Sequence, residues 1–509
     1  MNTGKICVSV CADTADEMIA SITRSEEFAD VIEVRFDCLD RSQVDTCRGG
    51  IADLKFEKPL LATFRSPEQG GNHTASLTDR TAFWRNPPRG FWAADLEEDV
   101  ISAAAGWETR ILSFHDFEKT PADLDAIYSR LATSDADLVK IAVQTDDITD
   151  AISVWQLLKR ARSENKQIVP ISMGEAGKCT RILGLAHGAF MTYASLDTGG
   201  ETAPGQITAK DMIEIYRVRE LDLNTKVYGV IGDPVSQSLS PYMHNPAFAS
   251  QNINAVFVPF LVKDLDGFVR RMVRKETREI ELNFCGFSVT MPHKRSIMKH
   301  LDAIDPTAEK IGAVNTVKIE VDKLTGYNTD SHGFITPLKK NFGDLSGMRV
   351  ALFGAGGAAR ACVHALKHEN ADVTIFARDL NKAELLANEF DVKSSELSKT
   401  KDQKLKIDLS NFDIIIDATP LGMKGPFENE SLFTAEQLDG VKFVYDLVTK
   451  ATDTPLIREA KKAGIPAIGG LEMLIAQGVR QFEIWTGGES PMELMRNSVL
   501  DRLIAGNQN

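Results

Sequence analysis

The sequence predicts an α/β protein, in which a (β/α)8 barrel precedes two smaller α/β domains, one of them dinucleotide-binding. Eight short apolar runs recur about every 20 to 30 positions through residues 1–220, as in a barrel of alternating strands and helices. Lys140 and His115 each lie at the C-terminal end of such a run. A glycine-rich turn, residues 354–360, separates a later apolar run from a helical pattern, and this order is typical of dinucleotide binding.

Length and composition indicate a multidomain globular protein. A chain of 509 residues is too long for one ordinary hydrophobic core and suggests about two to four domains. Its 43% hydrophobic and 26% charged residues are typical of soluble proteins. A net charge of −14 argues against a nucleic-acid partner, which needs clustered lysine and arginine. No apolar run reaches the roughly 18 residues of a membrane helix, so we expect no membrane partner.

The N-terminal residues and the cysteines predict a cytoplasmic protein. Residues 5–10 already read as a strand, which leaves no room for a signal or transit peptide. The seven cysteines are scattered without a CxxC pair, so we expect reduced, buried thiols and no disulfide. Cys7 and Cys11 lie close together in sequence but have no nearby histidine, and no other spacing predicts a metal site.

The barrel strands are expected at the apolar runs, because charged, helix-competent segments such as residues 14–28 and 147–164 lie between most of them. Barrel enzymes place their chemistry at the C-terminal ends of the strands. In the second run, alternation sends Glu33, Arg35 and Asp37 to one face, toward the barrel mouth. The runs are 5–10, 30–36, 59–64, 91–96, 110–114, 138–143, 167–172 and 190–196.

Lys140 is the strongest catalytic candidate of the first half. A lysine inside an apolar strand is costly to keep charged, and burial with nearby cations such as Arg35 and Arg65 would lower its pKa. The free amine can then attack a ketone and form an imine. Alternatively, Lys140 pairs with Glu33 as a buried ion pair. A histidine, His115, on the neighbouring strand and arginines around the mouth favour the catalytic interpretation.

Five motifs follow one another through residues 1–220: Glu33-x-Arg35-x-Asp37, Thr63-Phe64-Arg65-Ser66, Ser113-x-His115-Asp116-Phe117, Asp137-x-x-Lys140-Ile141-Ala142 and Ala203-Pro204-Gly205-Gln206. In this order they resemble type I 3-dehydroquinate dehydratase. The resemblance implies that Lys140 forms an imine with the substrate ketone, while His115 moves protons at C2 and at the departing hydroxyl. It further implies a carboxylate contact from Arg181, ring-hydroxyl contacts from Arg35, Arg65 and Gln206, and a position near the imine for Glu33.

Two positions depart from this family. Gln69 stands where the family motif Arg-Ser-x-x-Glu-Gly-Gly has its glutamate, so the side chain can hydrogen-bond but cannot ionise. Thr202 replaces the serine that precedes Ala-Pro-Gly-Gln and keeps the hydroxyl, so we still expect it to bind substrate. Neither change removes the imine mechanism.

The second half begins with a strand at residues 227–232, after a short connector at 218–226 that lacks Gly, Pro and Ser enrichment. The strand, glycine turn and helix of residues 350–360 predict a dinucleotide whose pyrophosphate lies at the helix N-terminus. The next strand ends in Ala377-Arg378 where an NAD enzyme usually has an acid, so Arg378 suits the 2′-phosphate of NADP. Alternatively, Arg378 is simply solvated.

Six further motifs run from about residue 226 to the C-terminus: Ser236-Gln237-Ser238-Leu239-Ser240-Pro241, Ser288-Val289-Thr290-Met291-Pro292-His293-Lys294, Gly312-Ala313-Val314-Asn315-Thr316, Asn328-Thr329-Asp330, Ala418-Thr419-Pro420-Leu421-Gly422-Met423 and Gly470-Leu471-Glu472-Met473-Leu474-Ile475-Ala476-Gln477. They resemble shikimate dehydrogenase. The resemblance implies a catalytic pair, Lys294 and Asp330, in which an ammonium beside a carboxylate protonates the developing alkoxide. The implied substrate contacts are Ser238, Ser240, Thr290, Asn315 and Gln477, and the expected NADP contacts are Gly354, Ala355, Gly356, Gly357, Ala358, Arg378, Thr419 and Gly470.

This half also departs from its family. Thr449 replaces the tyrosine of an Asp-x-x-Tyr motif, which removes one expected substrate contact. The family's Asn-Arg-Thr reads Ala377-Arg378-Asp379, so Asp379 puts a negative charge close to the expected 2′-phosphate.

Fused in this order, the two halves resemble the bifunctional dehydroquinate dehydratase–shikimate dehydrogenase family. The resemblance implies consecutive reactions, because 3-dehydroshikimate is the product of the first reaction and the substrate of the second. The expected domains are a dehydratase TIM barrel at 1–220, a substrate domain at 226–335 completed by helices within 471–509, and an NADP-binding Rossmann domain at 336–470. Two alternatives stay open. Catalytically inactive regulators of quinate metabolism share both domain types, and a quinate dehydrogenase would differ only in specificity.

Overall fold

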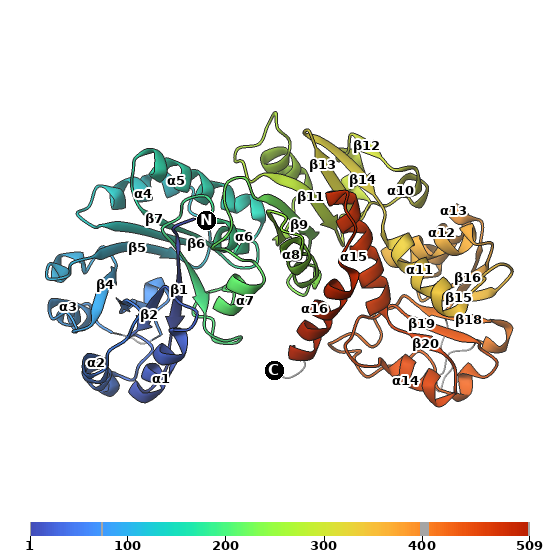
Figure 1. The fold of residues 1–509 in the computed structure, drawn as a ribbon, viewed down its shortest axis with the longest axis horizontal. Helices are drawn as coiled ribbons and strands as arrows, with labels where there is room; N and C mark the ends of the chain where they lie inside the picture. The colour runs from blue at the N-terminus through green and yellow to red at the C-terminus, as the bar shows by residue number, and fades with distance from the viewer. Residues whose placement is uncertain (1, 73–74, 398–406, 507–509) are drawn as a thin grey trace. The chain divides into compact units, whose positions relative to one another are not determined.

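The computed structural model describes residues 2–72, 75–397 and 407–506, which are drawn in colour in Figure 1. By its internal contacts the chain divides into two compact units. The first comprises residues 1–241 and 253–284, and the second comprises residues 242–252 and 285–509.

The first unit contains a barrel-like sheet of eight parallel strands, in the order β7-β6-β5-β4-β3-β2-β1-β8. Strand β1 pairs with both β2 and β8, and this pairing brings the last strand back to the first. Each apolar run expected from the sequence coincides with one strand to within two residues at either end, so the predicted barrel is confirmed. The strands are β1 Lys5–Val10, β2 Val31–Arg35, β3 Leu60–Thr63, β4 Phe91–Leu96, β5 Arg110–Asp116, β6 Leu138–Gln144, β7 Ile168–Met173 and β8 Met191–Ser195.

Helices lie between most of the barrel strands, as alternation of the two element types requires (Figure 1). The first begins at a side-chain cap, where Thr14 Oγ1 accepts a hydrogen bond from the Glu17 amide at 3.3 Å. The helices are α1 Ala15–Ser25, α2 Val44–Asp53, α3 Leu77–Arg85, α4 Leu124–Ala132, α5 Ile152–Ser163, α6 Lys178–Leu183 and α7 Ala209–Glu214.

Alternation along the strands gives the barrel interior an apolar layer with a polar layer above it. One buried cluster joins apolar side chains from all eight strands, among them Cys7, Leu61, Ile111 and Val169. Two residues further along several strands, the interior positions are polar, and buried there are Ser9, Glu33, Thr63, Asp95, Ser113 and Lys140. The interior of the barrel is therefore filled by apolar side chains toward the N-terminal ends of the strands and by polar and charged side chains toward their C-terminal ends.

The cysteines correct one expectation from the sequence. Cys11 and Cys38 form a disulfide, with their Cα atoms 5.4 Å apart, so the prediction of reduced thiols throughout was wrong for this pair. The two cysteines are 27 residues apart in sequence and come together only because each follows one of the adjacent strands β1 and β2, so their spacing alone did not predict the pairing. The other five cysteines take part in no disulfide.

The first unit also includes two parallel strands that follow the barrel, β9 Lys226–Gly232 and β10 Ala255–Leu261, with the short helix α9 Leu265–Phe268 after them. Helix α8, Ser240–Ser250, lies between these strands in sequence. Strand β11, Phe284–Val289, leads into the second unit, where it pairs antiparallel with β13, Thr316–Glu320. The other α-helices and β-strands that precede the next sheet are β12 Ala303–Ile304, β14 Lys323–Tyr327, α10 Pro306–Ile311 and α11 Asp330–Phe342.

A six-stranded parallel sheet in the order β17-β16-β15-β18-β19-β20 forms the predicted dinucleotide-binding domain. The strand order reverses direction at β15. In open α/β sheets, ligands bind at the C-terminal ends of the strands next to such a reversal. Helices α15 and α16 complete the second unit. The elements are β15 Arg349–Phe353, β16 Asp372–Ala377, β17 Lys393–Glu396, β18 Ile414–Asp417, β19 Phe443–Asp446, β20 Ala467–Ile468, α12 Gly357–His368, α13 Leu380–Phe390, α14 Pro455–Lys462, α15 Gly470–Thr486 and α16 Met492–Ala505.

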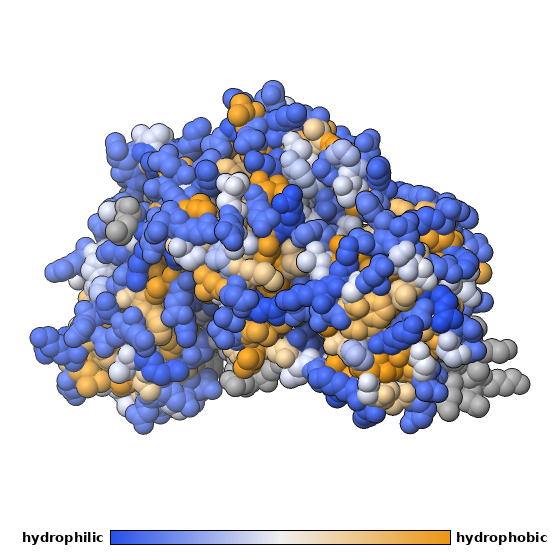
Figure 2. Space-filling view, turned by 45° about the vertical axis from the view of Figure 1, so that its right-hand side comes forward, coloured by the Kyte–Doolittle hydropathy of each residue, from blue (hydrophilic) through white to orange (hydrophobic). Residues whose placement is uncertain are grey.

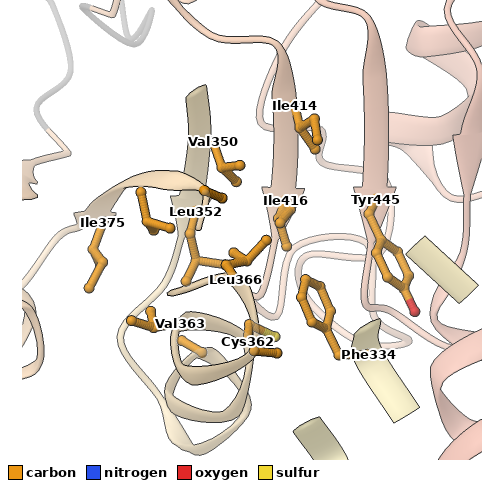
Figure 3. Packing of buried hydrophobic residues seen from close by; sticks show 14 of the residues in the cluster. Phe334, Val350, Leu352, Cys362, Val363, Leu366, Ile375, Ile414, Ile416 and Tyr445 are labelled. Atoms are coloured by element: carbon orange, nitrogen blue, oxygen red, sulfur yellow. The ribbon is translucent and has the colours of Figure 1, made fainter. Parts of the chain in front are cut away.

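One face of this sheet packs on helices α11 and α12 (Figure 3). Side chains of β15 and β18, such as Leu352 and Ile416, point toward Leu366 of α12. Phe334 of α11 stacks on Tyr445 of β19 with ring centroids 5.3 Å apart. Burying each such large side chain contributes about 1.5–3 kcal/mol, so this core holds the glycine turn between β15 and α12 in place.

The surface agrees with the acidic, charged composition. Figure 2 shows one face of the molecule, where hydrophilic side chains predominate and hydrophobic ones gather in smaller patches. Within the described ranges, no helix combines the length and the apolar character needed to span a bilayer. Nor do the described residues bring three or more His, Cys, Asp or Glu side chains together as metal ligands.

Candidate active sites

One pocket inside the barrel collects every catalytic and substrate residue that the sequence predicted for residues 1–220. Strands β5 and β6 pair so that Ser113 lies beside Lys140, and His115 follows two residues later on the same face. Because all the strands are parallel, their C-terminal ends meet at this pocket. The predicted residues in its lining are Glu33, Arg35, Arg65, His115, Lys140, Arg181, Thr202 and Gln206.

The ammonium group of Lys140 is buried among charged and aromatic groups, with 6% of its side chain exposed. Its Nζ lies 2.7 Å from Asp95 Oδ2 and 3.6 Å from Glu33 Oε1, and 3.8 Å from the ring centroid of Tyr193. The sequence prediction named Glu33 and missed Asp95. A signal was present, because Asp95 follows Ala93 by two residues in β4 and so shares its interior face.

Arg65 is held by three buried polar groups. Its guanidinium lies 2.8 Å from Asp95 Oδ1 and 3.2 Å from Glu97 Oε1, and it donates to Ser113 Oγ at 2.6 Å. Burial alone would lower the pKa of Arg65, but Asp95 and Glu97 raise it above its ordinary value. Burial would likewise raise the pKa of Asp95, whereas Arg65 and Lys140 hold it far below its usual range. Both groups are therefore ionised.

His115 is prepared to act as a neutral base. Burial lowers the pKa of its imidazole well below the ordinary value, and the positive charges of Arg65 and Lys140 lower it further. Gln69 Oε1 accepts a hydrogen bond from the His115 backbone amide at 3.0 Å and lies 3.2 Å from Nδ1. The backbone amide can only donate, so the Gln69 atom there is the oxygen, and a neutral His115 carries its proton on Nδ1. The Nε2 lone pair is then available to accept a proton.

Arg181 is a buried cation that no carboxylate accompanies in the described part of the chain. Its guanidinium donates only to backbone carbonyls, those of Tyr193 at 3.3 Å and Pro204 at 3.2 Å. Its Nε atom is buried without a hydrogen-bond partner. Burial lowers the pKa of Arg181 to about 10, which still leaves it charged at neutral pH. An unpaired cation in a pocket favours an anionic ligand.

Hydrogen bonds also hold two further side chains of the same pocket, those of Gln206 and Arg35. The Thr202 amide donates to Gln206 Oε1 at 2.7 Å, and Thr202 Oγ1 donates to Ser9 Oγ at 3.0 Å. Arg35 donates two hydrogen bonds to Asp37, at 2.8 and 2.6 Å. Burial would raise the pKa of Asp37, but Arg35 lowers it below its ordinary value. Arg35 and Gln206 thus have fixed orientations toward a ligand.

The second candidate site is the pair Lys294 and Asp330. Lys294 Nζ donates to Asp330 Oδ2 at 2.5 Å, and Asn315 Nδ2 donates to the other carboxylate oxygen at 2.8 Å. Asp330 is the first residue of α11 and only 3% exposed, whereas 23% of the Lys294 side chain is exposed. The lysine therefore has a carboxylate behind it and an open side on which a ligand can lie.

Of the other predicted substrate residues of this half, Gln477 lies within helix α15, and the rest lie at or next to the ends of helices and strands. Asn315 also donates to Gln477 Oε1 of α15 at 3.3 Å, which brings Gln477 to the catalytic pair. Thr290 directly follows β11, four residues before Lys294. In the first unit, the Ser240 amide at the start of α8 donates to Ser238 Oγ at 3.3 Å. The substrate roles of Thr290, Ser238 and Ser240 stay predictions.

The glycine turn after β15 has the close backbone approach that a nucleotide needs. Gly354 adopts a positive φ of 112°, and a Cβ there would lie 2.8 Å from the carbonyl oxygen of Ala418. At Gly356 a Cβ would meet nothing within 4 Å, so the backbone at the start of α12 is accessible. A Cβ at Gly357 would lie 4.0 Å from Lys294 Cδ, which places the turn beside the catalytic pair. Ala355 belongs to the turn, and Ala358 to the first turn of α12.

The end of β16 supplies the predicted phosphate contact. Arg378 is exposed, and no hydrogen bond or ion pair holds it within the residues described. Asp379 is the N-cap of α13 and accepts from the Lys382 amide at 3.2 Å, while Lys382 Nζ lies 3.6 Å from its carboxylate. The Asp379 carboxylate, which the sequence placed close to the expected 2′-phosphate, thus caps the N-terminus of α13. Lys382, which the sequence prediction did not name, is thus a second cation near the start of α13.

The last two predicted cofactor residues lie on the same edge of the sheet. The Thr419 amide donates to Asp417 Oδ1 at 2.8 Å, directly after β18. Gly470 begins α15, where a Cβ would lie 2.1 Å from the carbonyl oxygen of Leu447. Only glycine permits this approach of helix and loop.

Family models of known proteins match separate stretches of the chain. The family model for type I 3-dehydroquinase matches residues 6–222. The model for the shikimate dehydrogenase substrate binding domain matches residues 230–317, and that for shikimate/quinate 5-dehydrogenase matches residues 337–436. The model for the shikimate 5′-dehydrogenase C-terminal domain matches residues 470–500.

Curated relatives and solved structures give the same result. The bifunctional 3-dehydroquinate dehydratase/shikimate dehydrogenase of Arabidopsis thaliana, described as chloroplastic, is 33% identical over 97% of this chain and 84% of its own length. The NADP(+) shikimate dehydrogenase of Methanocaldococcus jannaschii is 41% identical over 56% of this chain and 99% of its own. A crystal structure of shikimate dehydrogenase in complex with NADP+ matches with a TM-score of 0.50 and 40% identity, over 56% of this chain and 97% of that one. The chain therefore belongs to the bifunctional 3-dehydroquinate dehydratase/shikimate dehydrogenase family.

Proposed function

We propose that this chain catalyses two consecutive steps of the shikimate pathway. The barrel dehydrates 3-dehydroquinate to 3-dehydroshikimate, and the second half reduces 3-dehydroshikimate to shikimate with NADPH. One observation carries the proposal: a single chain holds a buried lysine in a pocket with a neutral histidine and an unpaired arginine, and also a lysine–aspartate pair beside a nucleotide turn. The first is a lyase site and the second an oxidoreductase site.

In the barrel, the Lys140 ammonium gives up one proton, and the free amine attacks the carbon of the substrate ketone. The ketone oxygen takes this proton and one more from the nitrogen and leaves as water, so that one N–H and the positive charge remain on the nitrogen. The resulting protonated imine draws electrons from C2, so that His115 can remove a C2 proton through Nε2. His115 then returns a proton to the departing hydroxyl, which leaves as water. A second water hydrolyses the imine and releases the product.

The substrate carboxylate and hydroxyls have matching groups in the barrel pocket. Arg181 is a buried cation with an unsatisfied Nε, which suits the carboxylate. Arg35 and Gln206 are already oriented by hydrogen bonds and can contact ring hydroxyls without a large loss of side-chain freedom. Arg65, Thr202 and Glu33 line the rest of the pocket.

In the second half, Lys294 and Asp330 act as a unit. The Lys294 ammonium protonates the alkoxide that forms when the ketone is reduced, and Asp330 compensates its charge. Asn315 holds Asp330 and Gln477 together, so the same amide orients the acid and a substrate-binding side chain. Thr290, Ser238 and Ser240 are proposed to bind the substrate carboxylate and hydroxyls.

The residues around the glycine turn fit NADP. The accessible backbone at Gly356 and the N-terminus of α12 suit a pyrophosphate, and Arg378 with Lys382 suits a 2′-phosphate. When bound, the cofactor supplies the hydride for the ketone. Ala355, Ala358, Thr419 and Gly470 are proposed to line the rest of its site, and no metal is proposed in either half.

We also propose the finer organisation that the sequence predicted. Residues 1–220 form the dehydratase, residues 226–335 with helices of 471–509 the substrate domain, and residues 336–470 the NADP-binding domain. The partners are small molecules, 3-dehydroquinate, 3-dehydroshikimate and shikimate, without nucleic acid or membrane. The proposed location is the cytoplasm, which fractionation of the source cells would test.

The experiment is a coupled assay on the purified chain. Given 3-dehydroquinate and NADPH, the chain should consume both and form shikimate, while 3-dehydroquinate with borohydride should attach a reduced adduct to Lys140. Initial rates with shikimate and quinate, each with NADP and NAD, test specificity. Failure of both assays would favour an inactive regulator, and faster turnover of quinate would favour a quinate dehydrogenase.

A further inference from the structure

We infer that Asp95 is a catalytic residue of the barrel site, acting as the counter-ion of the Lys140 nitrogen while that nitrogen is a protonated imine. The inference rests on the proposed dehydration and names a residue that the sequence motifs did not indicate. Asp95 touches the reacting atom itself, because its Oδ2 lies 2.7 Å from Lys140 Nζ.

The geometry around Asp95 is that of a fixed anion with two cations. Its side chain is completely buried, and its other oxygen, Oδ1, lies 2.8 Å from the Arg65 guanidinium. Arg65 is in turn bound by Glu97, which pairs further with Arg80. The carboxylate therefore cannot rotate away without leaving a buried guanidinium and a buried ammonium without their counter-charge, which is unfavourable in a buried site.

Asp95 is closer to the nitrogen than the carboxylate that the sequence named. Glu33 Oε1 lies 3.6 Å from Lys140 Nζ, and both Glu33 oxygens already accept hydrogen bonds from the hydroxyls of Ser9 and Thr63. Hydroxyl donors reduce the charge that Glu33 can offer to the lysine. Asp95 Oδ2, by contrast, accepts from Lys140.

The charge of the nitrogen changes during the reaction, and this gives Asp95 its effect. Imine formation joins the nitrogen to the ketone carbon, releases water and leaves one N–H with a positive charge. When the C2 proton moves to His115, the C–H electron pair passes to the nitrogen, which becomes a neutral enamine. When the hydroxyl leaves with a proton from His115, the cationic imine forms again. Each cationic state keeps an N–H that can donate to Asp95 Oδ2.

A fixed carboxylate at this distance favours the protonated imine over the neutral imine, and only the protonated form withdraws electrons strongly from C2. Arg65 and Lys140 hold the pKa of Asp95 far below its usual range, so it does not take this proton away. Asp95 thus keeps the electron sink charged over a wide range of pH.

The test compares Asp95→Asn with Glu97→Gln in the full chain. Glu97 is the matched control, because it binds Arg65 at 3.2 Å as Asp95 does at 2.8 Å but makes no contact with Lys140. Both variants perturb Arg65, and only Asp95→Asn removes the anion at the nitrogen. The readouts are kcat and KM for dehydration across pH, and the fraction of Lys140 trapped by borohydride with 3-dehydroquinate.

We expect Asp95→Asn to lower kcat by at least about tenfold, the effect of one charge-assisted hydrogen bond, and to move the alkaline limb of its pH profile to lower pH. Glu97→Gln should change mainly KM and leave the alkaline limb in place. Equal losses in the two variants with unmoved limbs would show that Asp95 only positions Arg65, and the inference would fail. Absence of dehydration and trapping in the unsubstituted chain would instead refute the proposed function.

A second variant covers the case in which Asp95→Asn does not fold, as judged by its circular dichroism melting curve. Asp95→Glu keeps the charge but moves it, so kcat should fall while the alkaline limb stays at the pH of the unsubstituted chain. A limb that moved downward in Asp95→Glu would contradict the counter-ion role, because the anion is still present in that variant.

Discussion

Gln69 Oε1 accepts a hydrogen bond from the backbone amide of His115 at 3.0 Å and lies 3.2 Å from Nδ1 of the same histidine. Two donors from one residue thus converge on one amide oxygen. This contact fixes the ring and the tautomer of the proposed base without adding a negative charge beside it. It explains how the chain can carry glutamine where the family motif has glutamate.

The first prediction concerns the charge at position 69. Gln69→Glu places a carboxylate at Nδ1, which stabilises the imidazolium and raises the pKa of His115. The base form of His115 is then lost at a higher pH, so the acidic limb of the kcat/KM profile for dehydration should move upward. The measurement is the initial rate of 3-dehydroshikimate formation across pH.

Gln69→Ala is the companion variant, because it removes the acceptor without adding a charge. We expect it to lower kcat through loss of ring orientation, with a smaller movement of the acidic limb than in Gln69→Glu. If both variants moved the limb equally, the charge at position 69 would not control His115.

The second prediction is that the two activities are separable. The barrel pocket and the Lys294–Asp330 pair share no residue, so Lys140→Ala should abolish dehydration and leave shikimate oxidation nearly unchanged. Lys294→Ala should do the reverse. Each activity is measured by itself with its own substrate. Loss of the dehydrogenase in a folded Lys140→Ala variant would contradict the two-site interpretation.

The third prediction concerns cofactor choice. Arg378 is exposed at the end of β16 with no partner in the described residues, so its guanidinium is available to a 2′-phosphate. One charge-assisted contact contributes about 1.5–3 kcal/mol, which is at least tenfold in binding. Arg378→Ala should therefore raise KM for NADP by about tenfold or more and barely change KM for NAD. Equal increases with both cofactors would show that Arg378 serves the fold alone.

The fourth prediction concerns the pH dependence of stability in the NADP-binding domain. Asp417 and Asp446 end two adjacent strands, and burial followed by repulsion from Asp446 raises the pKa of Asp417 well above its ordinary value. The folded state therefore binds this proton more tightly than the unfolded state. Its contribution to stability is complete below the unfolded value of about 3.8 and is lost as pH rises through the folded pKa. Asp417→Asn should reduce this loss, as measured by urea unfolding across pH.

Asp413 is a control of opposite sign that lies just before the same strand. Hydrogen bonds from Arg349 lower the pKa of Asp413 below its ordinary value, although burial opposes this. Its contribution to stability is therefore present above the unfolded pKa and is lost as pH falls through the folded value. Asp413→Asn should remove stability at neutral pH and weaken the acid dependence. If Asp417→Asn and Asp413→Asn changed the free energy of unfolding in the same direction across pH, the opposite pKa shifts assigned to Asp417 and Asp413 would be wrong.

The sequence alone determined the order of elements and most of the pocket residues. Eight apolar runs gave eight strands, because alternation and run length are local properties that survive in the fold. Glu33, Arg35, His115 and Lys140 lie in one pocket because they sit at the ends of parallel strands. The glycine turn before α12 was likewise predictable, since close backbone approach requires glycine wherever the chain runs.

Only the tertiary structure decided which partners these residues have. Asp95 and Lys140 are 45 positions apart, and only the sheet register brings the carboxylate to the nitrogen. The Cys11–Cys38 disulfide depends in the same way on the return of the chain through β2, and spacing rules gave the wrong expectation for it. Local sequence fixes which face a side chain takes, because that follows from the backbone period. The distance between charges on different strands follows from packing and register, and these distances decide pKa values, counter-ions and the chemistry of the site.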